Sequence, residues 1–564
     1  MSNSSDSRVR DSGWDDSLYE ERRHAATPDR SEPPETSEPS ATEAGGGGGG
    51  HRRTGRRPRR SRKARIIRGT AIAVSLAVLG ASGAVWAYYE HLNGQIIKGQ
   101  RDNGNSDVKP AKANAAGQTP MNILLLGSDS RNSAANLKLG GAKYTVGDKP
   151  RADVIMLMHL SADRKNMSVI SIPRDTRVPI PECTDPDTGQ KYAATTTSII
   201  NESLTRGGAG CTLATVQNLT NTYIDHWMVI DFAGVVKMAD AIGGVQVCVR
   251  QNVWDHPTAA QSGGSGLKLK AGSREISGKT ALQWLRTRHA WGSDIGRAKA
   301  QHMYMTSMMR KLRKQNIFTD TGHLMNLAEA ATSSLKVSEE IGSIKKLYDL
   351  GMQLKTVPNN RITMLTMPTL KDPLNPKAHL VPGPDASQIW AMLRNDIAFD
   401  TNGKAKTGTA SASPAASTAA SAAPAASIAV SVVNGTAGTA AGTPVDHRAA
   451  TLVTALKDAG FTKAEPDSTA QPSQVTTLSY PAADGDQGRA DALAVAKALD
   501  IPKASVKKSS HVSSITLIAG ADWTKGTDYA KSLPSAGSSL ANADSINGAN
   551  TKDCMSVYAP YQWS

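Results

Sequence analysis

Short apolar runs bounded by glycine and polar residues open the region that follows residue 120. The first run is MNILLLGSD, which begins at Met121, and the second is DVIMLMHL, from Asp153 to Leu160. A third run, MSVISIP, covers Met167 to Pro173. Continuous apolar runs of this length are typical of strands buried on both faces of a sheet. We therefore expect three buried strands at the start of this region.

Helical patterns follow these strands. Apolar residues at helical spacing predict helices over Leu213 to Thr222, Phe232 to Ala241 and Lys279 to Arg286, the last after an N-cap at Ser277. Two strand-like runs, VQVCVR and ITMLTMP, are interleaved with these helices. Because strands and helices alternate, the sequence predicts an α/β class and a layered α/β sandwich over residues 118–400.

A second, smaller module is predicted after a low-complexity segment. Residues 401–427 are dominated by Ala, Ser and Pro and are typical of a linker. Residues 428–523 then alternate between strand and helix patterns, from IAVSVVNGT to SSITLIAG, and predict a compact α/β domain. Residues 524–564 are rich in Ser, Ala and Asn, so we expect a loose tail there.

An uncharged apolar stretch precedes the first strand. Residues 69–89 number 21 and carry no charge, so as a helix they would extend about 31 Å, which matches the hydrocarbon thickness of a bilayer. Trp86, Tyr88 and Tyr89 lie at its far end, where an aromatic belt is expected. We predict an uncleaved transmembrane helix followed by a polar stalk over residues 90–117; a cleaved signal peptide is the alternative.

The flank of this stretch is strongly basic. Residues 51–68 contain nine Arg and one Lys without an acidic residue, which fits either a nucleic-acid patch or the cytoplasmic flank of a membrane span. Since the run adjoins the apolar stretch, contact with anionic lipid favours the membrane flank. Residues 1–50 are polar and end in six glycines, which predicts a disordered cytoplasmic tail. The bulk of the chain then lies outside the membrane.

All four cysteines of the 564-residue chain follow the predicted span. Four cysteines are too few for a disulfide framework or a Cys-rich zinc array. Disulfides persist outside the cytoplasm, and Cys183 and Cys211 lie in one polar region, so we expect a bridge between them. Buried free thiols are the alternative.

Candidate chemistry is concentrated at the ends of the predicted strands. The chain contains no Walker loop, HExxH, GxSxG or paired CxxC motif outside the span. Instead, Asp and Arg gather around the strand ends and in the stretch RTRHAWGSDIGRAKAQ, and the candidates are Asp129, Arg151, Asp153, Arg174, Asp175, Arg177, Arg286, Arg288, Asp294, Arg297 and Gln301. Ligands of layered α/β folds usually bind at strand ends.

Arginine and aspartate together suit a polyphosphate with a divalent cation. Guanidinium groups match pairs of phosphate oxygens, and carboxylates hold Mg²⁺ while phosphates fill its other positions. Arg297 and Gln301 would lie on one face of a helix, four residues apart. Solvated surface ion pairs are the alternative interpretation of the same residues.

Five motifs, in this order, carry a resemblance to a known family: NILLLGSDSR, RADVIMLMHL, SIPRDTRV, DHWMVIDFAGVVKMADAIGGV and LRTRHAWGSDIGR. From about Met121 to Lys311 the chain resembles the LytR-CpsA-Psr family of membrane-anchored cell-wall glycopolymer ligases. Residues 428–523 are similar to the LytR C-terminal domain appended to actinobacterial members. The resemblance implies an α/β/α sandwich with an apolar pocket for a polyprenyl chain.

The resemblance also implies roles for individual residues. Asp129 and Asp153 would hold Mg²⁺ or Mn²⁺, Asp175 and Asp294 would orient arginines, and the catalytic set would be Asp129, Asp153, Arg174, Arg286 and Arg288. The substrate would be bound by Arg151, Arg174, Arg177, Arg286, Arg288, Arg297 and Gln301. One departure from the family pattern is Ala300, where members commonly have Arg.

Two functions of different classes follow. The first is a phosphotransferase that moves a glycopolymer phosphate, such as a teichoic acid, from a polyprenyl pyrophosphate carrier to peptidoglycan, with pyrophosphate hydrolysis as a side activity. The second is a non-catalytic envelope protein that binds polyprenyl carriers or wall polymer. Either would have the membrane as a partner and no nucleic acid, with one span, a cytoplasmic N-terminus and an extracytoplasmic bulk.

Overall fold

The computed structural model describes residues 62–111, 113–114, 116–128, 139, 149–259, 261–314, 321–400, 420–438, 442–469, 471–538 and 543–564. The tail predicted over residues 1–50, most of the basic run at 51–68 and most of the linker at 401–427 lie outside these residues. The chain divides into two compact units, Met1–Leu76 and Ala77–Ser564.

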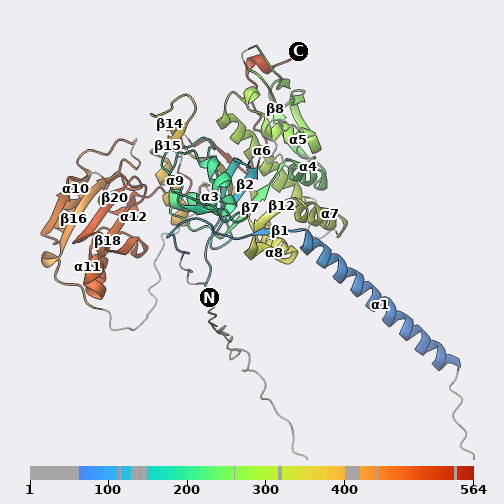
Figure 1. Ribbon diagram of the computed structural model, residues 1–564, viewed down its shortest axis with the longest axis horizontal. Helices are drawn as coiled ribbons and strands as arrows, with labels where there is room; N and C mark the ends of the chain where they lie inside the picture. Colours follow the sequence, from blue (N-terminus) through green and yellow to red (C-terminus); the bar gives the residue numbers. More distant parts are fainter. Residues whose placement is uncertain are drawn as a thin grey trace, which may run out of the picture. The chain divides into compact units, whose positions relative to one another are not determined.

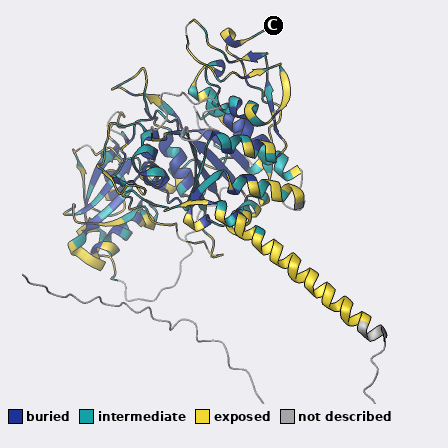
Figure 2. Cartoon of the chain, turned by 45° about the vertical axis from the view of Figure 1, so that its right-hand side comes forward, coloured by how far each residue is buried: buried dark blue, intermediate teal, exposed yellow. Residues whose placement is uncertain are grey.

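Among the described residues, one helix has the length and composition to cross a membrane. Helix α1 spans Arg62–Gln95, and its segment Ile66–Gln95 is the candidate span, with a mean hydropathy of 1.8 over its apolar window. None of that window is buried within the protein, and Figure 2 shows most of the described helix as exposed, although Leu92 near its end is buried. The predicted span at residues 69–89 lies inside this segment, so the sequence placed the apolar helix correctly.

An eight-stranded mixed sheet forms the centre of the larger unit (Figure 1). Its strands, in spatial order, are β1 (Ile97–Gly99), β12 (Leu335–Ser338), β7 (His226–Ile230), β2 (Met121–Ser128), β3 (Ala152–Leu160), β4 (Met167–Ser171), β13 (Ile362–Thr366) and β21 (Ser545–Asn547). The three strands expected from the apolar runs are β2, β3 and β4. Strand β1 was expected in a polar stalk, but it pairs in parallel with β12 at the sheet edge.

Helices cover both faces of this sheet. They are α3 (Ser203–Thr220), α4 (Phe232–Ala241), α5 (Gly278–Arg286), α6 (Asp294–Lys314), α7 (Thr321–Thr332), α8 (Ile344–Thr356) and α9 (Ala386–Arg394). Side chains of a strand alternate between faces. Ile155 of β3 therefore packs with Leu213 of α3 and Ile389 of α9, while Met156 packs on the other face with Leu350 of α8. The predicted α/β/α sandwich is confirmed.

Four two-stranded ribbons complete this part of the chain. They pair β5 (Cys183–Thr184) with β6 (Lys191–Tyr192), β8 (Val245–Val249) with β11 (Gly272–Ile276), β9 (Val253–Trp254) with β10 (Lys268–Leu269), and β14 (Thr369–Lys371) with β15 (Leu380–Pro382). Ser277 precedes α5 with extended backbone, as the sequence predicts, but its hydroxyl makes no capping hydrogen bond. Asp231 caps α4 by accepting a hydrogen bond from the Gly234 amide at 2.8 Å.

The small α/β domain expected at residues 428–523 is also present. Its five-stranded sheet has the order β17 (Lys463–Asp467), β16 (Ala429–Gly435), β20 (Ile515–Gly520), β18 (Thr477–Pro481) and β19 (Val506–Ser509). Helices α10 (Arg448–Asp458) and α11 (Gly485–Ala498) pack on it, and α12 (Tyr529–Ser532) follows. Gly460 ends α10 with a φ of +95°, a conformation that favours glycine.

The C-terminal residues return to the larger sheet instead of forming the expected loose tail. Strand β21 pairs antiparallel with β13. A disulfide then joins Cys554 to Cys248 of β8, 306 residues earlier. Met555, Val557 and Tyr561 are buried in the core formed by α4, α5, α6 and β8. The apolar residues of the tail are few and lie among Ser, Ala and Asn, and they find their partners only in the tertiary structure.

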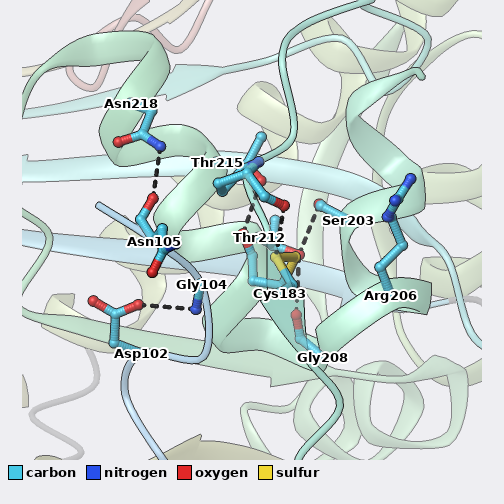
Figure 3. Close-up of a disulfide and its surroundings, with 12 residues drawn as sticks. Asp102, Gly104, Asn105, Cys183, Ser203, Arg206, Gly208, Thr212, Thr215 and Asn218 are labelled. Atoms are coloured by element: carbon cyan, nitrogen blue, oxygen red, sulfur yellow. Dashed lines mark hydrogen bonds between the residues drawn. A yellow bond between two sulfur atoms is a disulfide. The ribbon is translucent and has the colours of Figure 1, made fainter. Parts of the chain in front are cut away.

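The predicted bridge between Cys183 and Cys211 is present (Figure 3), with Cα atoms 5.6 Å apart. It fastens the β5–β6 ribbon to α3. The helix is interrupted at Gly207 and Gly208, and Gly208 has a φ of +66°. A side chain at Gly207 would come within 2.9 Å of the Cys183 Cβ, so the glycine allows this close approach.

Removal of this bridge should destabilise the protein. In the chain-entropy account, a bridge between residues 28 positions apart contributes about 3 to 4 kcal/mol to the free energy of unfolding. We expect a loss of that order for Cys183→Ala/Cys211→Ala, measured by denaturant unfolding of full-length protein in detergent. Under reducing conditions the variant and the wild type should have similar free energies of unfolding. Equal stability under oxidising conditions would contradict the bridge.

Candidate active site

A cavity of about 830 Å³ lies on the face of the large sheet that α6 covers. Strands β2, β3 and β7 form its floor, and α4, α5 and α6 supply its walls. Most of its lining is apolar, and the apolar side chains include Leu125, Met156, Met228, Val229, Phe232, Val235, Met238, Leu282, Leu285, Tyr304, Met305, Met308 and Leu335. Such a lining favours a ligand with a substantial hydrocarbon part.

Arginine side chains interrupt this apolar surface. Arg174, which follows β4, lines the cavity and donates from Nη1 to Asp153 Oδ1 at 2.5 Å. Its Nε lies 3.4 Å from Asp175 Oδ2. Burial by itself would lower the pKa of Arg174, but the two carboxylates outweigh burial and raise it. Asp153 and Asp175 therefore keep this guanidinium charged and fix its direction.

The segment between α5 and α6 and the first turn of α6 add a second cationic pair, Arg288 and Arg297. Arg297 contacts Asp294 at 2.8 Å, and Arg288 contacts the same carboxylate at 3.6 Å. Arg297 also donates to the Asp153 carbonyl at 3.5 Å. Burial, together with the nearby charge of Arg174, lowers the pKa of Arg297 despite Asp294. Since a buried cation near other cations gains from an added anion, this group is well suited to bind phosphate.

Arg286 and Gln301 line the same cavity. Arg286 donates to the Leu139 carbonyl at 3.1 Å, and its guanidinium lies 4.5 Å from the centre of the Phe232 ring. Gln301 donates to the Leu285 carbonyl at 3.1 Å and holds the end of α5 against α6. A second cavity of about 30 Å³, room for roughly one water, adjoins the first at Asp153 and Arg174.

The structure brings together most of the residues predicted for the site. Of the predicted residues that the structure describes, those that line the main cavity are Asp153, Arg174, Arg286, Arg288, Arg297 and Gln301. Asp175 and Asp294 hold arginines in place. Asp129 lies outside the described residues. Arg151 is exposed and is not among the described lining residues.

Arg177 was predicted to bind the substrate, but its contacts in the structure indicate a structural role. It forms a two-pronged ion pair with Asp372, from Nε at 2.6 Å and from Nη2 at 2.7 Å. Asp372 is fully buried, and the Arg177 hydrogen bond lowers its pKa to about 2. This pair connects the segment after β4 to the β14–β15 ribbon, so the structure gives Arg177 a structural partner outside the cavity.

The fit of a divalent cation rests on few residues. The described part of the chain contains no group of three His, Cys, Asp or Glu side chains arranged to hold a metal. Asp153 remains suited to a Mg²⁺ ion because Arg174 engages only one of its oxygens. Mg²⁺ usually takes one or two carboxylates and fills its other positions with water and phosphate oxygens. A cation carried in with a phosphate ligand is therefore compatible with this cavity.

Three further residues of the site were missed by the sequence analysis. Asp231, Asp255 and His289 also line the cavity. Asp231 could have been found as a helix cap before Phe232, and His289 directly follows the RTR motif. Asp255 lies in a polar Gly/Ser-rich loop that has no periodic pattern, so no sequence signal could separate it from ordinary loop residues.

Ala300 does not disturb the site. Its side chain is fully buried in the core behind α6, beside Trp284, whose Nε1 donates to the Ala300 carbonyl at 2.9 Å. The departure from the family pattern therefore lies outside the described cavity lining.

Two family models match the chain. The LytR_cpsA_psr family model matches residues 88–395, which is more than half of the chain. The model described as LytR cell envelope-related transcriptional attenuator matches residues 427–523, the small C-terminal domain.

Several known proteins are similar in sequence or fold. "Cell wall biosynthesis protein LcpA" from Corynebacterium glutamicum is 26% identical over 59% of this chain and 65% of its own length. "Polyisoprenyl-teichoic acid--peptidoglycan teichoic acid transferase TagU" from Bacillus anthracis is 25% identical over 48% of this chain and 80% of its own. The crystal structure of Bacillus subtilis TagV, 22% identical, covers 50% of this chain and 97% of its own with a TM-score of 0.38. The match to LcpA thus spans just under two thirds of that protein.

Substitution of Arg174 and of Arg177 should distinguish an arginine that binds the ligand from one that stabilises the fold. Arg174→Ala removes a cavity-lining guanidinium, so we expect the affinity for inorganic pyrophosphate to fall about tenfold or more in calorimetric titration. Arg177→Ala should leave that affinity unchanged but lower the free energy of unfolding by about 1 to 3 kcal/mol, because Asp372 loses its hydrogen bonds. Weaker pyrophosphate binding by Arg177→Ala would return this residue to the binding set.

Proposed function

Because the chain belongs to the LytR-CpsA-Psr family, we propose that it transfers a phosphate-linked cell-wall glycopolymer from a polyprenyl pyrophosphate carrier to peptidoglycan. Hydrolysis of the pyrophosphate by water is the corresponding side reaction. The names of the relatives support attachment of wall polymer as the broader activity: LcpA is named a cell wall biosynthesis protein and TagU a teichoic acid transferase.

One observation carries the proposal. The same cavity combines an extended apolar lining with the guanidinium groups of Arg174, Arg286, Arg288 and Arg297. A polyprenyl pyrophosphate has the matching combination of a long hydrocarbon chain and two adjacent phosphates. Apolar burial would hold the chain, and paired guanidinium hydrogen bonds would hold the phosphates. A purely hydrophilic nucleotide or sugar would leave most of this lining without a partner.

The proposed reaction is a substitution at phosphorus. A hydroxyl of the peptidoglycan acceptor attacks the phosphorus next to the polymer, and polyprenyl phosphate leaves. Negative charge spreads over the phosphate oxygens in the transition state, where fixed guanidinium groups stabilise it. Asp153, Asp175 and Asp294 keep the arginines in position before the substrate arrives, so little reorganisation is needed during reaction.

Mg²⁺ or Mn²⁺ is the proposed cofactor. Asp153 would hold it through its second oxygen, with Asp129 as the other protein ligand implied by the family pattern. Such a cation would supply positive charge that offsets the negative charge developing on the leaving group.

We also propose the cell membrane as the site of action. Helix α1 would be the single anchor, with the basic run on the cytoplasmic side and the sheet and cavity outside. This arrangement supplies a lipid-linked donor from the membrane and places the acceptor, peptidoglycan, in the same compartment.

Replacement of Arg286 or Arg288 tests this proposal. Each Arg→Ala change removes a fixed charge beside the phosphates, so we expect the transfer rate to fall on the order of 10²-fold. Lys should restore little of it, because an ammonium lacks the planar pair of donors. The assay measures transfer from a synthetic polyprenyl pyrophosphate-linked sugar to peptidoglycan fragments, with full-length protein in detergent.

Arg274→Ala supplies the matched control, since Arg274 is exposed on β11 and is not among the described residues that line the cavity. It should transfer at the wild-type rate. If Arg286→Ala and Arg288→Ala also did so while still binding the donor, a carrier-binding envelope protein would replace the transferase as the function.

A second test addresses the cation. Asp153→Asn keeps an oxygen that can accept the Arg174 hydrogen bond but removes the charge that would hold Mg²⁺. We expect the variant to need at least about tenfold more Mg²⁺ for half-maximal transfer and to bind Mn²⁺ more weakly in electron paramagnetic resonance titrations. The surface variant Asp349→Asn should match the wild type. An unchanged cation requirement for Asp153→Asn would remove Asp153 from the metal site.

A further inference from the structure

A transfer to a hydroxyl group needs a group that accepts the proton of that hydroxyl. Among the described residues that line the main cavity, four side chains could accept a proton: Asp153, Asp231, Asp255 and His289. Their surroundings differ, and these differences select one of them.

The three carboxylates are already engaged. Asp153 forms the ion pair with Arg174, and Asp231 caps α4 through the Gly234 amide. Asp255 is only 1% exposed, and its Oδ2 accepts a hydrogen bond from the Ser265 amide at 2.7 Å, which closes the loop after β9. Asp153 is also the proposed ligand of the cation, and the Asp255 Oδ1, which lacks a hydrogen-bond partner among the described residues, is buried. None of the three is therefore as available to an acceptor hydroxyl as the imidazole of His289.

His289 has a different environment. It is partly exposed and directly follows Arg288 in the segment between α5 and α6. Its Nδ1 is buried without a hydrogen-bond partner in the described part of the chain, so Nε2 is the nitrogen that an incoming group can reach. Imidazole is also the side chain best suited to exchange protons near neutral pH.

The C-terminal tail packs beside this ring. Tyr561 lies against His289 with ring centres 6.1 Å apart and planes at 26°. The Tyr558 amide donates to the carbonyl of Ala290 at 2.9 Å. Tyr561 is itself buried in the core that the Cys248–Cys554 disulfide closes. The tail thus holds the segment that carries both Arg288 and His289, which allows a side chain to be placed beside the reacting atoms.

We propose that His289 is the catalytic base of the transfer and that Tyr561 is its positioning residue; this inference rests on the proposed function. His289 Nε2 accepts the proton of the acceptor hydroxyl as its oxygen forms a bond to phosphorus. The bond between that phosphorus and the bridging oxygen of the pyrophosphate breaks, and its electron pair leaves with the polyprenyl phosphate. The protonated imidazole then loses its proton to solvent.

The test compares His289→Gln, His289→Ala and the control His511→Gln, whose histidine is exposed in the small domain. A general base contributes about 10²-fold to 10⁴-fold, so we expect transfer by both His289 variants to fall by at least about 10²-fold. Binding of the polyprenyl pyrophosphate-linked sugar, measured by intrinsic fluorescence, should be unchanged. Free imidazole should restore transfer by His289→Ala but not by Arg288→Ala, which lacks a charge instead of a base.

Tyr561→Phe keeps the ring against His289 and should retain most of the rate, whereas Tyr561→Leu should lower kcat with little change in KM for the donor. Wild-type transfer by His289→Gln, or a loss in His289→Ala that imidazole does not restore, would overturn the role of His289 and leave the proposed function standing. Failure of the wild type to transfer the polymer would reject the proposed function and this inference together.

Discussion

The arrangement of the candidate site depends on one electrostatic constraint, the confinement of several guanidinium groups at an apolar wall. Arg174 and Arg297 are largely buried, and the charge of Arg174 helps to lower the pKa of Arg297. Without compensation, such a cluster would repel itself and lose hydration. Asp153, Asp175 and Asp294 offset part of this cost and fix the directions of the guanidinium groups.

The fold supplies these groups from separate parts of the chain. Strand β3 provides Asp153, the turn after β4 provides Arg174, and the start of α6 provides Arg297. Packing between the sheet and α6 holds the three elements in fixed register, and buried His302 adds a 2.7 Å hydrogen bond from α6 to Ser171 of β4. Burial lowers the pKa of His302 to about 3, so this link is neutral at physiological pH.

The chain returns to the large domain after it has formed the small one. Residues 543–564 follow that domain in sequence but complete the edge of the large sheet and the core behind α5 and α6. The large α/β domain is therefore discontinuous in sequence. The small domain is inserted in the chain between β13 and β21, the last two strands of the large sheet. The disulfide between Cys248 and Cys554 fastens this return, so residues far apart in sequence share one core.

The sequence by itself determined the apolar helix, the buried strands, both α/β domains and the cluster of Asp and Arg, because periodicity and strand-end position are local properties. Only the tertiary structure decided which arginines share the cavity: Arg174 and Arg177 are three residues apart, yet one lines the cavity and the other pairs with Asp372. It also decided the fate of the tail. Contacts such as Tyr561 with His289 join residues 272 positions apart and leave no local pattern.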